Sequence, residues 1–147
     1  MTREEMEIYL DHFNNKRYDE VVDYFADDVT VQYPNAFLLN IAPGTLLRGK
    51  NEFIENYKTF HENVEEYLDL EDFIADEKYV FIILHTEFIA KEDLAWEDGI
   101  LEKGKAAVVS DFISYELDDE GKFKKIKIAH HKITYPGGDE ARHTLSV

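Results

Sequence analysis

Apolar residues in the first part of the chain recur at helical spacing. Thr2 followed by Glu5 is typical of a capping box, and apolar positions then recur every three or four residues up to Phe13. A short second helix is predicted with its buried side at residues 21–25, and a third over residues 51–64. The pattern therefore predicts three N-terminal helices, each with one apolar face.

Alternating apolar and polar residues dominate the rest of the chain. A short strand is predicted at residues 29–33, where the run ends before Pro34. Four long strands are predicted at residues 67–75, 79–90, 105–117 and 123–135, with turns between them. Because helices come first and long strands follow, we expect an α+β fold with the three helices packed on one face of an antiparallel sheet.

The chain suits one domain. Its 147 residues contain no internal repeat and no linker that would divide them. We therefore predict a single domain over residues 1–135. Residues 136–147 open with Pro-Gly-Gly and form a C-terminal tail that need not be ordered.

The charge of the chain argues against several partners. Lys and Arg number 16 against 32 Asp and Glu, a formal net charge of −16, which repels nucleic-acid phosphates and anionic lipid. There is no Cys, so disulfides, thiolate catalysis and Cys-ligated zinc are excluded. No apolar run approaches the ~20 residues that span a bilayer, and the charged N-terminus lacks a signal region. We expect a cytoplasmic protein that binds neither nucleic acid nor membrane.

Asp111 is the most informative polar position. It shares a strand face with Val109, Ile113, Tyr115 and Leu117, which is the more apolar of the two faces. A carboxylate in such a row is either desolvated, which favours its protonated form, or paired. The alternatives are an Asp that binds a helix terminus or a backbone amide, and a functional acid in a pocket.

His130 is a second candidate, provided that the last strand contains a bulge. Phe123 lies three residues before Ile126, which breaks the alternation of that strand, and one extra residue at 124–125 restores it. The bulged register sets Asp111 opposite His130 on the same face. Such a pair would fix the imidazole tautomer and keep a proton acceptor available near neutral pH. Without the bulge, His130 would point outward.

The other histidines allow more than one interpretation. If His130 faces inward, the adjacent His131 lies on the outer sheet face. His85 and Glu87 either complete a polar cluster or line the outer face, and His61 is expected to be a partly buried structural histidine. We expect no metal site, because His85 and Glu87 supply only two ligands.

Several short motifs make the chain resemble a known superfamily. They are Tyr9 in the first helix, the segment 25–31 at the first strand, Arg-Gly-Lys at 48–50, and Asp111 ahead of the hairpin at 121–122. The sequence is similar to the nuclear transport factor 2-like superfamily, in its SnoaL-like and ketosteroid-isomerase-like branch.

The resemblance covers residues 2–135 and implies a conical α+β barrel. In this architecture a strongly curved antiparallel sheet and the helices enclose a deep pocket, and the convex sheet face forms a homodimer. In the strand predicted at residues 79–90, both rows of alternating residues are apolar, including the row Val80, Ile82, Leu84 and Phe88. We therefore expect a partner to cover the outer face. The superfamily includes isomerases, dehydratases, cyclases, epoxide hydrolases and proteins without catalysis, so the fold alone does not choose among them.

The resemblance also assigns two tyrosines. Tyr9 falls where ketosteroid isomerase has its oxyanion-hole tyrosine, and Asp111 falls near that enzyme's protonated aspartic acid. Tyr33, before Pro34, stands where the steroid isomerases carry their Asp base. An unactivated tyrosine, with a pKa near ~10, is a poor base at neutral pH, so steroid isomerisation by the usual route is not expected. The alternative for Tyr9 is an ordinary residue of the helix stripe.

The sequence thus predicts a cofactor-free enzyme that performs acid–base chemistry on a small hydrophobic, oxygenated molecule. It would be an isomerase, dehydratase, cyclase or epoxide hydrolase, with Asp111 and His130 as the acid–base pair and Tyr9 and Tyr33 as hydrogen-bond donors. The predicted pocket-lining residues are Phe13, Phe37, Phe53, Tyr57, Ile113, Ile128 and Trp96, with Trp96 and residues 36–47 at the mouth. The alternative is a non-catalytic module that binds a ligand or another protein.

Overall fold

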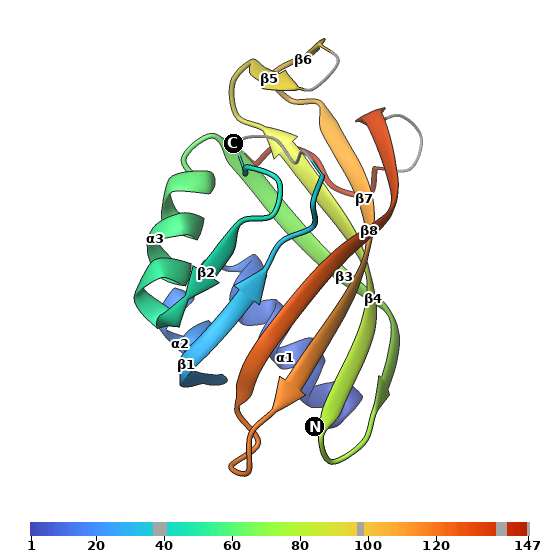
Figure 1. Ribbon diagram of the computed structural model, residues 1–147. Helices are drawn as coiled ribbons and strands as arrows, with labels where there is room; N and C mark the ends of the chain where they lie inside the picture. Colours follow the sequence, from blue (N-terminus) through green and yellow to red (C-terminus); the bar gives the residue numbers. More distant parts are fainter. Residues whose placement is uncertain (37–40, 97–98, 138–140, 147) are drawn as a thin grey trace.

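Helices cover the concave face of one curved sheet (Figure 1). The computed structural model describes residues 1–36, 41–96, 99–137 and 141–146. The helices are α1 (Arg3–Asn14), α2 (Tyr18–Val22) and α3 (Gly49–Phe60). Within the described residues no helix is long and apolar enough to cross a membrane.

The main sheet has six strands in the order β2-β1-β8-β7-β4-β3. Its strands are β1 (Phe25–Gln32), β2 (Leu46–Arg48), β3 (Val64–Ala75), β4 (Tyr79–Ala90), β7 (Ala106–Leu117) and β8 (Phe123–Gly137). All neighbours are antiparallel except β1 and β8, which run parallel. The short strands β5 (Leu94–Trp96) and β6 (Gly99–Leu101) form a separate hairpin. In the described part of the chain the strongly curved sheet remains an open cone, with β2 and β3 at its edges.

The predicted α+β architecture with three N-terminal helices is confirmed, with local differences. β1 begins at Phe25, four residues before the predicted strand, because Phe25 pairs with Phe123 at the start of β8. The third helix ends at Phe60 and not near Val64, because Val64 already pairs with Ala90 of β4. Strands β2, β5 and β6 lie in segments that the sequence pattern predicted as connections.

Helix α1 begins as its sequence predicts. The Thr2 hydroxyl accepts a hydrogen bond from the Glu5 backbone N–H at 3.1 Å, and the Glu5 carboxylate accepts one from the Thr2 N–H at 3.0 Å. This capping box satisfies two backbone donors that the first turn leaves free. The helix then buries Met6, Tyr9, Leu10 and Phe13 against the concave face of the sheet.

The predicted bulge in the last strand is present. Leu117 pairs with Phe123 and Glu116 pairs with Lys125, so Lys124 is the extra residue of β8. Beyond this bulge the register pairs Tyr115 with Ile126, Ile113 with Ile128 and Asp111 with His130. The bulged alternation therefore brings Asp111 and His130 to the same face of the sheet.

A second irregularity separates the two adjacent histidines of β8. The register shifts again directly after the Asp111–His130 pair, where His131 is the additional residue. His131 is exposed, and its ring stacks on Phe112 at a centroid distance of 4.9 Å. The prediction that His131 lies on the outer face when His130 faces inward is confirmed.

One sequence interpretation of β4 was wrong. The row Val80, Ile82, Leu84 and Phe88 does not form the outer face, because these residues are at most 3% exposed and belong to the core. The reason is the register with β7, which pairs Ile82 with Ile113 and Leu84 with Asp111 on the concave side. The outer face of β4 therefore carries the alternate row, which includes Phe81, His85 and Glu87.

The orientation of β4 predicts that substitutions of two isoleucines differ in their effect on stability. Ile82→Ala should lower the free energy of unfolding by about 2–5 kcal/mol, because Ile82 is only 3% exposed in the core. The control Ile8→Ala should change it by no more than about 0.5 kcal/mol, because Ile8 is 53% exposed on α1. Urea unfolding followed by circular dichroism measures both. Equal effects of the two substitutions would contradict this orientation.

Candidate acid–base site

An apolar cavity lies between the helices and the concave side of the sheet. It encloses about 50 Å³. Its lining includes the predicted residues Tyr9, Phe13, Tyr33, Phe53, Tyr57, Asp111, Ile113, Ile128 and His130, together with Glu66 and Tyr115 among others. Ligand pockets usually measure about 300–1,000 Å³, so the lining must move outward before a substrate of ordinary size can enter.

Asp111 and His130 form a hydrogen-bonded pair in this cavity. Their side chains are 8% and 6% exposed, and His130 Nδ1 contacts Asp111 Oδ1. The hydroxyl of Thr86 donates to the other carboxylate oxygen, Oδ2, at 3.3 Å. Both oxygens of this buried carboxylate are therefore engaged, and the ring of His130 is held by its Nδ1 atom.

The second ring nitrogen of His130 is free. Nε2 is buried and has no hydrogen-bond partner among the residues that the structure describes. With Nδ1–H donated to Asp111, a neutral imidazole carries its lone pair on Nε2. Once Nε2 has taken up a proton, the adjacent carboxylate stabilises the resulting imidazolium. The arrangement can therefore accept a proton and return it.

The predicted tyrosines are buried in the same cavity. The hydroxyls of Tyr33 and Tyr57 hydrogen-bond to each other. Burial raises the pKa of Tyr33 well above its ordinary value, although the hydrogen bond from Tyr57 acts in the opposite direction, and the negative charges of Glu66 and Asp111 raise it further. Burial also raises the pKa of Tyr9. Both side chains stay protonated at neutral pH, which makes them donors and not bases.

Sequence reasoning missed a second carboxylate in the cavity. Glu66 is 5% exposed, and its Oε1 atom lies 2.9 Å from His61 Nε2, while His61 Nδ1 lies 2.6 Å from the hydroxyl of Tyr18. This chain of hydrogen bonds leads from the cavity to a half-buried tyrosine near the surface. The signal was the alternation of Val64, Glu66 and Leu68, which was overlooked because the strand was predicted to begin at Tyr67.

Several predicted residues lie elsewhere. His85 and Glu87 belong to the outer face of β4, not to the cavity. The backbone of Trp96 pairs with Gly99 in the β5–β6 hairpin. The Trp96 side chain and the whole of Phe37 lie outside the described residues, so their predicted places at the pocket mouth stay predictions.

The curved α+β cone and the Asp111–His130 pair in its cavity indicate the class of protein, and comparisons with known proteins identify the family. Residues 6–126 match the SnoaL-like domain family, and the chain belongs to this family. Its fold is that of the nuclear transport factor 2-like superfamily. No curated protein matches the chain.

Solved structures with this fold share little sequence with the chain. An NTF2-like protein of unknown function from Burkholderia pseudomallei is 14% identical, with a TM-score of 0.66 and coverage of 89% of this chain and 92% of that chain. SalBIII, an epoxide hydrolase/cyclase-like enzyme in pyran ring formation in the polyether salinomycin, is 14% identical, with a TM-score of 0.64 and coverage of 88% and 89%. RV0760c from Mycobacterium tuberculosis, in complex with estradiol-17beta-hemisuccinate, is 13% identical, with a TM-score of 0.66 and coverage of 86% and 92%.

The raised pKa values of the buried tyrosines predict how stability depends on pH. Burial raises the pKa of Tyr9, Tyr33, Tyr57 and Tyr115, four tyrosines that lie in the core. The stability from keeping them neutral is complete below the pKa of an unfolded tyrosine, about 10, and is lost as the pH rises above it. We expect these four to ionise only as the protein unfolds in base.

Ultraviolet absorbance of tyrosinate and far-ultraviolet circular dichroism, recorded over the same alkaline titration, measure this. Tyr33→Phe should shrink the late absorbance step that accompanies unfolding. The control Tyr79→Phe should leave this late step unchanged, because Tyr79 is already 37% exposed in the folded protein. Reversible ionisation of all nine tyrosines near pH 10, with the dichroism unchanged, would contradict the burial described above.

Proposed function

We propose that this protein is a cofactor-independent enzyme that performs acid–base chemistry on a hydrophobic, oxygenated small molecule. The observation that carries the proposal is the buried Nε2 atom of His130, which has no hydrogen-bond partner among the described residues. Asp111 holds the ring of this histidine in a mostly apolar cavity. A buried polar atom without a partner is uncommon in folded proteins, and a substrate would supply the missing hydrogen bond.

In the proposed mechanism His130 transfers the proton, and Asp111 positions the His130 ring. Neutral His130 takes a proton from a carbon next to a carbonyl, from a hydroxyl or from water through Nε2. Asp111 holds the ring by Nδ1–H and stabilises the imidazolium that forms. The imidazolium then returns the proton to another carbon or to a leaving oxygen. Isomerisation, dehydration, cyclisation and epoxide opening all consist of such steps.

The lining supports the proposed class of substrate. Aromatic and aliphatic side chains form most of the cavity wall, which favours a hydrophobic molecule. The protonated hydroxyls of Tyr9 and Tyr33 would donate hydrogen bonds to an oxygen that gains negative charge during the reaction. SalBIII is described as epoxide hydrolase/cyclase-like, and RV0760c was crystallised with a steroid ester, so related folds accommodate molecules of this kind.

A probe panel tests the catalytic role. It contains cyclic epoxides, β-hydroxy ketones and β,γ-unsaturated ketones, which report on hydrolase, dehydratase and isomerase activity. For a probe that is turned over, His130→Gln should lower kcat by about 10²–10⁴-fold while binding is retained, because the general base is lost. Asp111→Asn should also lower kcat, because the neutral amide cannot stabilise the imidazolium. With its oxygen still accepting from Thr86, its NH2 group faces Nδ1 and imposes the other tautomer.

The control is His131→Gln, which should leave kcat unchanged, because His131 is exposed on the outer face. Nitrogen chemical shifts of His130 should report the Nδ1–H tautomer in the unmodified protein and its loss in Asp111→Asn. Undiminished turnover by His130→Gln would refute the mechanism. Probes that bind in the cavity but are never turned over would favour a non-catalytic binding module.

We also propose that a second copy of the chain covers the outer face of the sheet. An outer groove of about 500 Å³ lies over β3, β4, β7 and β8. Two of the side chains that line it, Ile74 and Phe81, are 70% and 51% exposed, and Phe112 is 43% exposed. An exposed apolar patch of this kind is typical of an interaction surface. This is the face that the superfamily resemblance assigned to a homodimer.

The dimer can be tested by light scattering coupled to size exclusion at micromolar concentration. The unmodified chain should elute with twice its mass of 17.2 kDa. Phe81→Glu should yield monomers, because it places a charge without a partner in the interface. The control Ile8→Glu, on exposed α1, should remain dimeric. A monomeric unmodified protein would rule this assembly out.

A further inference from the structure

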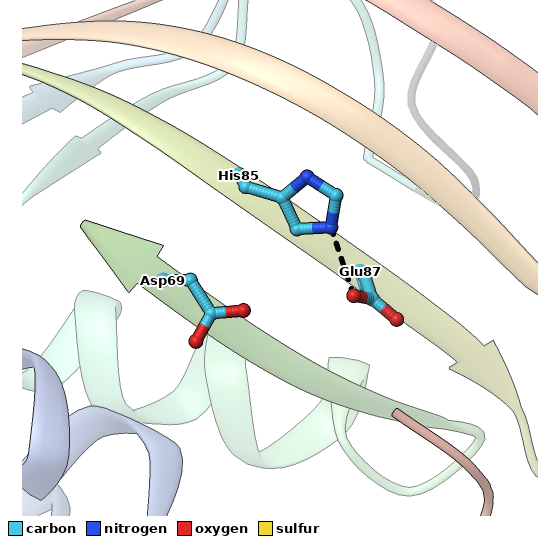
Figure 2. A group of neighbouring side chains, drawn as sticks. All are labelled: Asp69, His85 and Glu87. Atoms are coloured by element: carbon cyan, nitrogen blue, oxygen red, sulfur yellow. Dashed lines mark hydrogen bonds and ion pairs between the residues drawn. The ribbon is translucent and has the colours of Figure 1, made fainter. Parts of the chain in front are cut away.

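A polar cluster lies on the outer face of the sheet, on the opposite side of β4 from the cavity. Asp69 of β3 pairs in register with His85 of β4, and Glu87 follows two residues along the same strand. Figure 2 shows the three side chains converging, with the His85 ring turned toward Glu87. His85 Nε2 lies 2.8 Å from Glu87 Oε2, and one ligand atom from each of the three residues lies within 4.8 Å of the other two.

The C-terminal tail brings a fourth donor to this cluster. His143 Nε2 lies 3.0 Å from Asp69 Oδ2, and the His143 ring stacks on Tyr67 at a centroid distance of 4.3 Å. The backbone N–H groups of Arg142 and His143 donate to the Glu87 carboxylate at 2.8–3.0 Å. The tail therefore reaches two members of the cluster, Asp69 through the His143 ring and Glu87 through backbone N–H groups.

The net negative charge of this cluster favours binding of a cation. The carboxylates of Asp69, Glu71 and Glu87 stand against one guanidinium, that of Arg142, which leaves a formal charge of −2 when both imidazoles are neutral. Glu87 is fully buried, and a buried carboxylate requires a compensating charge or strong hydrogen bonds. Two protons on the imidazoles or one divalent ion would neutralise the cluster equally well.

We propose that Asp69, His85, Glu87 and His143 bind a divalent transition-metal ion of the zinc type, which fastens the C-terminal tail to the sheet. Imidazole ligands favour zinc and its neighbours over calcium and magnesium, which prefer oxygen ligands. Four side-chain ligands complete a tetrahedral zinc site. The N–H groups of Arg142 and His143 would orient the Glu87 carboxylate as outer hydrogen-bond donors.

This metal site is independent of the proposed catalysis. Its β4 residues, His85 and Glu87, alternate with Leu84 and Thr86, which belong to the buried inner row. The sequence supplied only two ligands close together, His85 and Glu87. Asp69 and His143 are 16 or more residues away along the chain from His85, and only the sheet register and the path of the tail bring them there.

Metal titration of the full-length, tag-free chain tests the proposal. After chelator treatment, calorimetric titration with ZnCl₂ should give one bound ion per chain, and Co²⁺ should give the intense visible absorption of a tetrahedral site. His143→Gln and Asp69→Asn should each weaken zinc binding by at least about tenfold, because each removes a ligand. His131→Gln, a histidine elsewhere on the outer face, is the matched control and should bind zinc unchanged.

Hydrogen exchange gives a readout of the tail itself. Zinc should slow exchange of the Arg142 and His143 amides in the unmodified chain and in His131→Gln, but not in His85→Gln. Circular dichroism of each variant verifies that the sheet is intact. Absence of zinc binding by the unmodified chain, or unchanged binding by the His143, Asp69 and His85 variants, would overturn the proposal.

Discussion

The extra residue Lys124 in β8 determines which side chains of that strand reach the cavity. Strand residues alternate between two faces, so a single inserted residue exchanges the faces for the remainder of the strand. Because the register of β8 on β7 resumes after Lys124, Ile126, Ile128 and His130 all face inward. Without that residue His130 would lie outside and Asp111 would have an alanine opposite. The candidate site therefore depends on one local irregularity of the sheet.

The same alternation separates two kinds of chemistry on β4. The inner row contributes Leu84 to the cavity and Thr86 to the buried Asp111 carboxylate. The outer row contributes His85 and Glu87 to the cluster that the tail covers. On one side β4 contacts the buried Asp111–His130 pair, and on the other side it carries part of the charged cluster of Asp69, His85 and Glu87. The sheet backbone lies between the two groups of side chains.

Burial determines the chemical character of the cavity. The tyrosines around it stay protonated because an apolar environment disfavours their charged form, and the nearby carboxylates of Glu66 and Asp111 act in the same direction. Among these groups His130 has a buried nitrogen, Nε2, with no hydrogen-bond partner in the described part of the chain. Burial keeps this nitrogen away from bulk water.

Local patterns in the sequence determined much of this protein, because capping, periodicity and alternation depend on neighbouring residues. The Thr2–Glu5 capping box, the long strands and the break between Phe123 and Ile126 were all visible, and the last of these predicted the Asp111–His130 pair. Only the tertiary structure decided which row of β4 faces the core, that Glu66 enters the cavity, and that His143 returns to Asp69. These features depend on pairing between distant strands and on the path of the tail, which bring together residues whose spacing along the chain has no period.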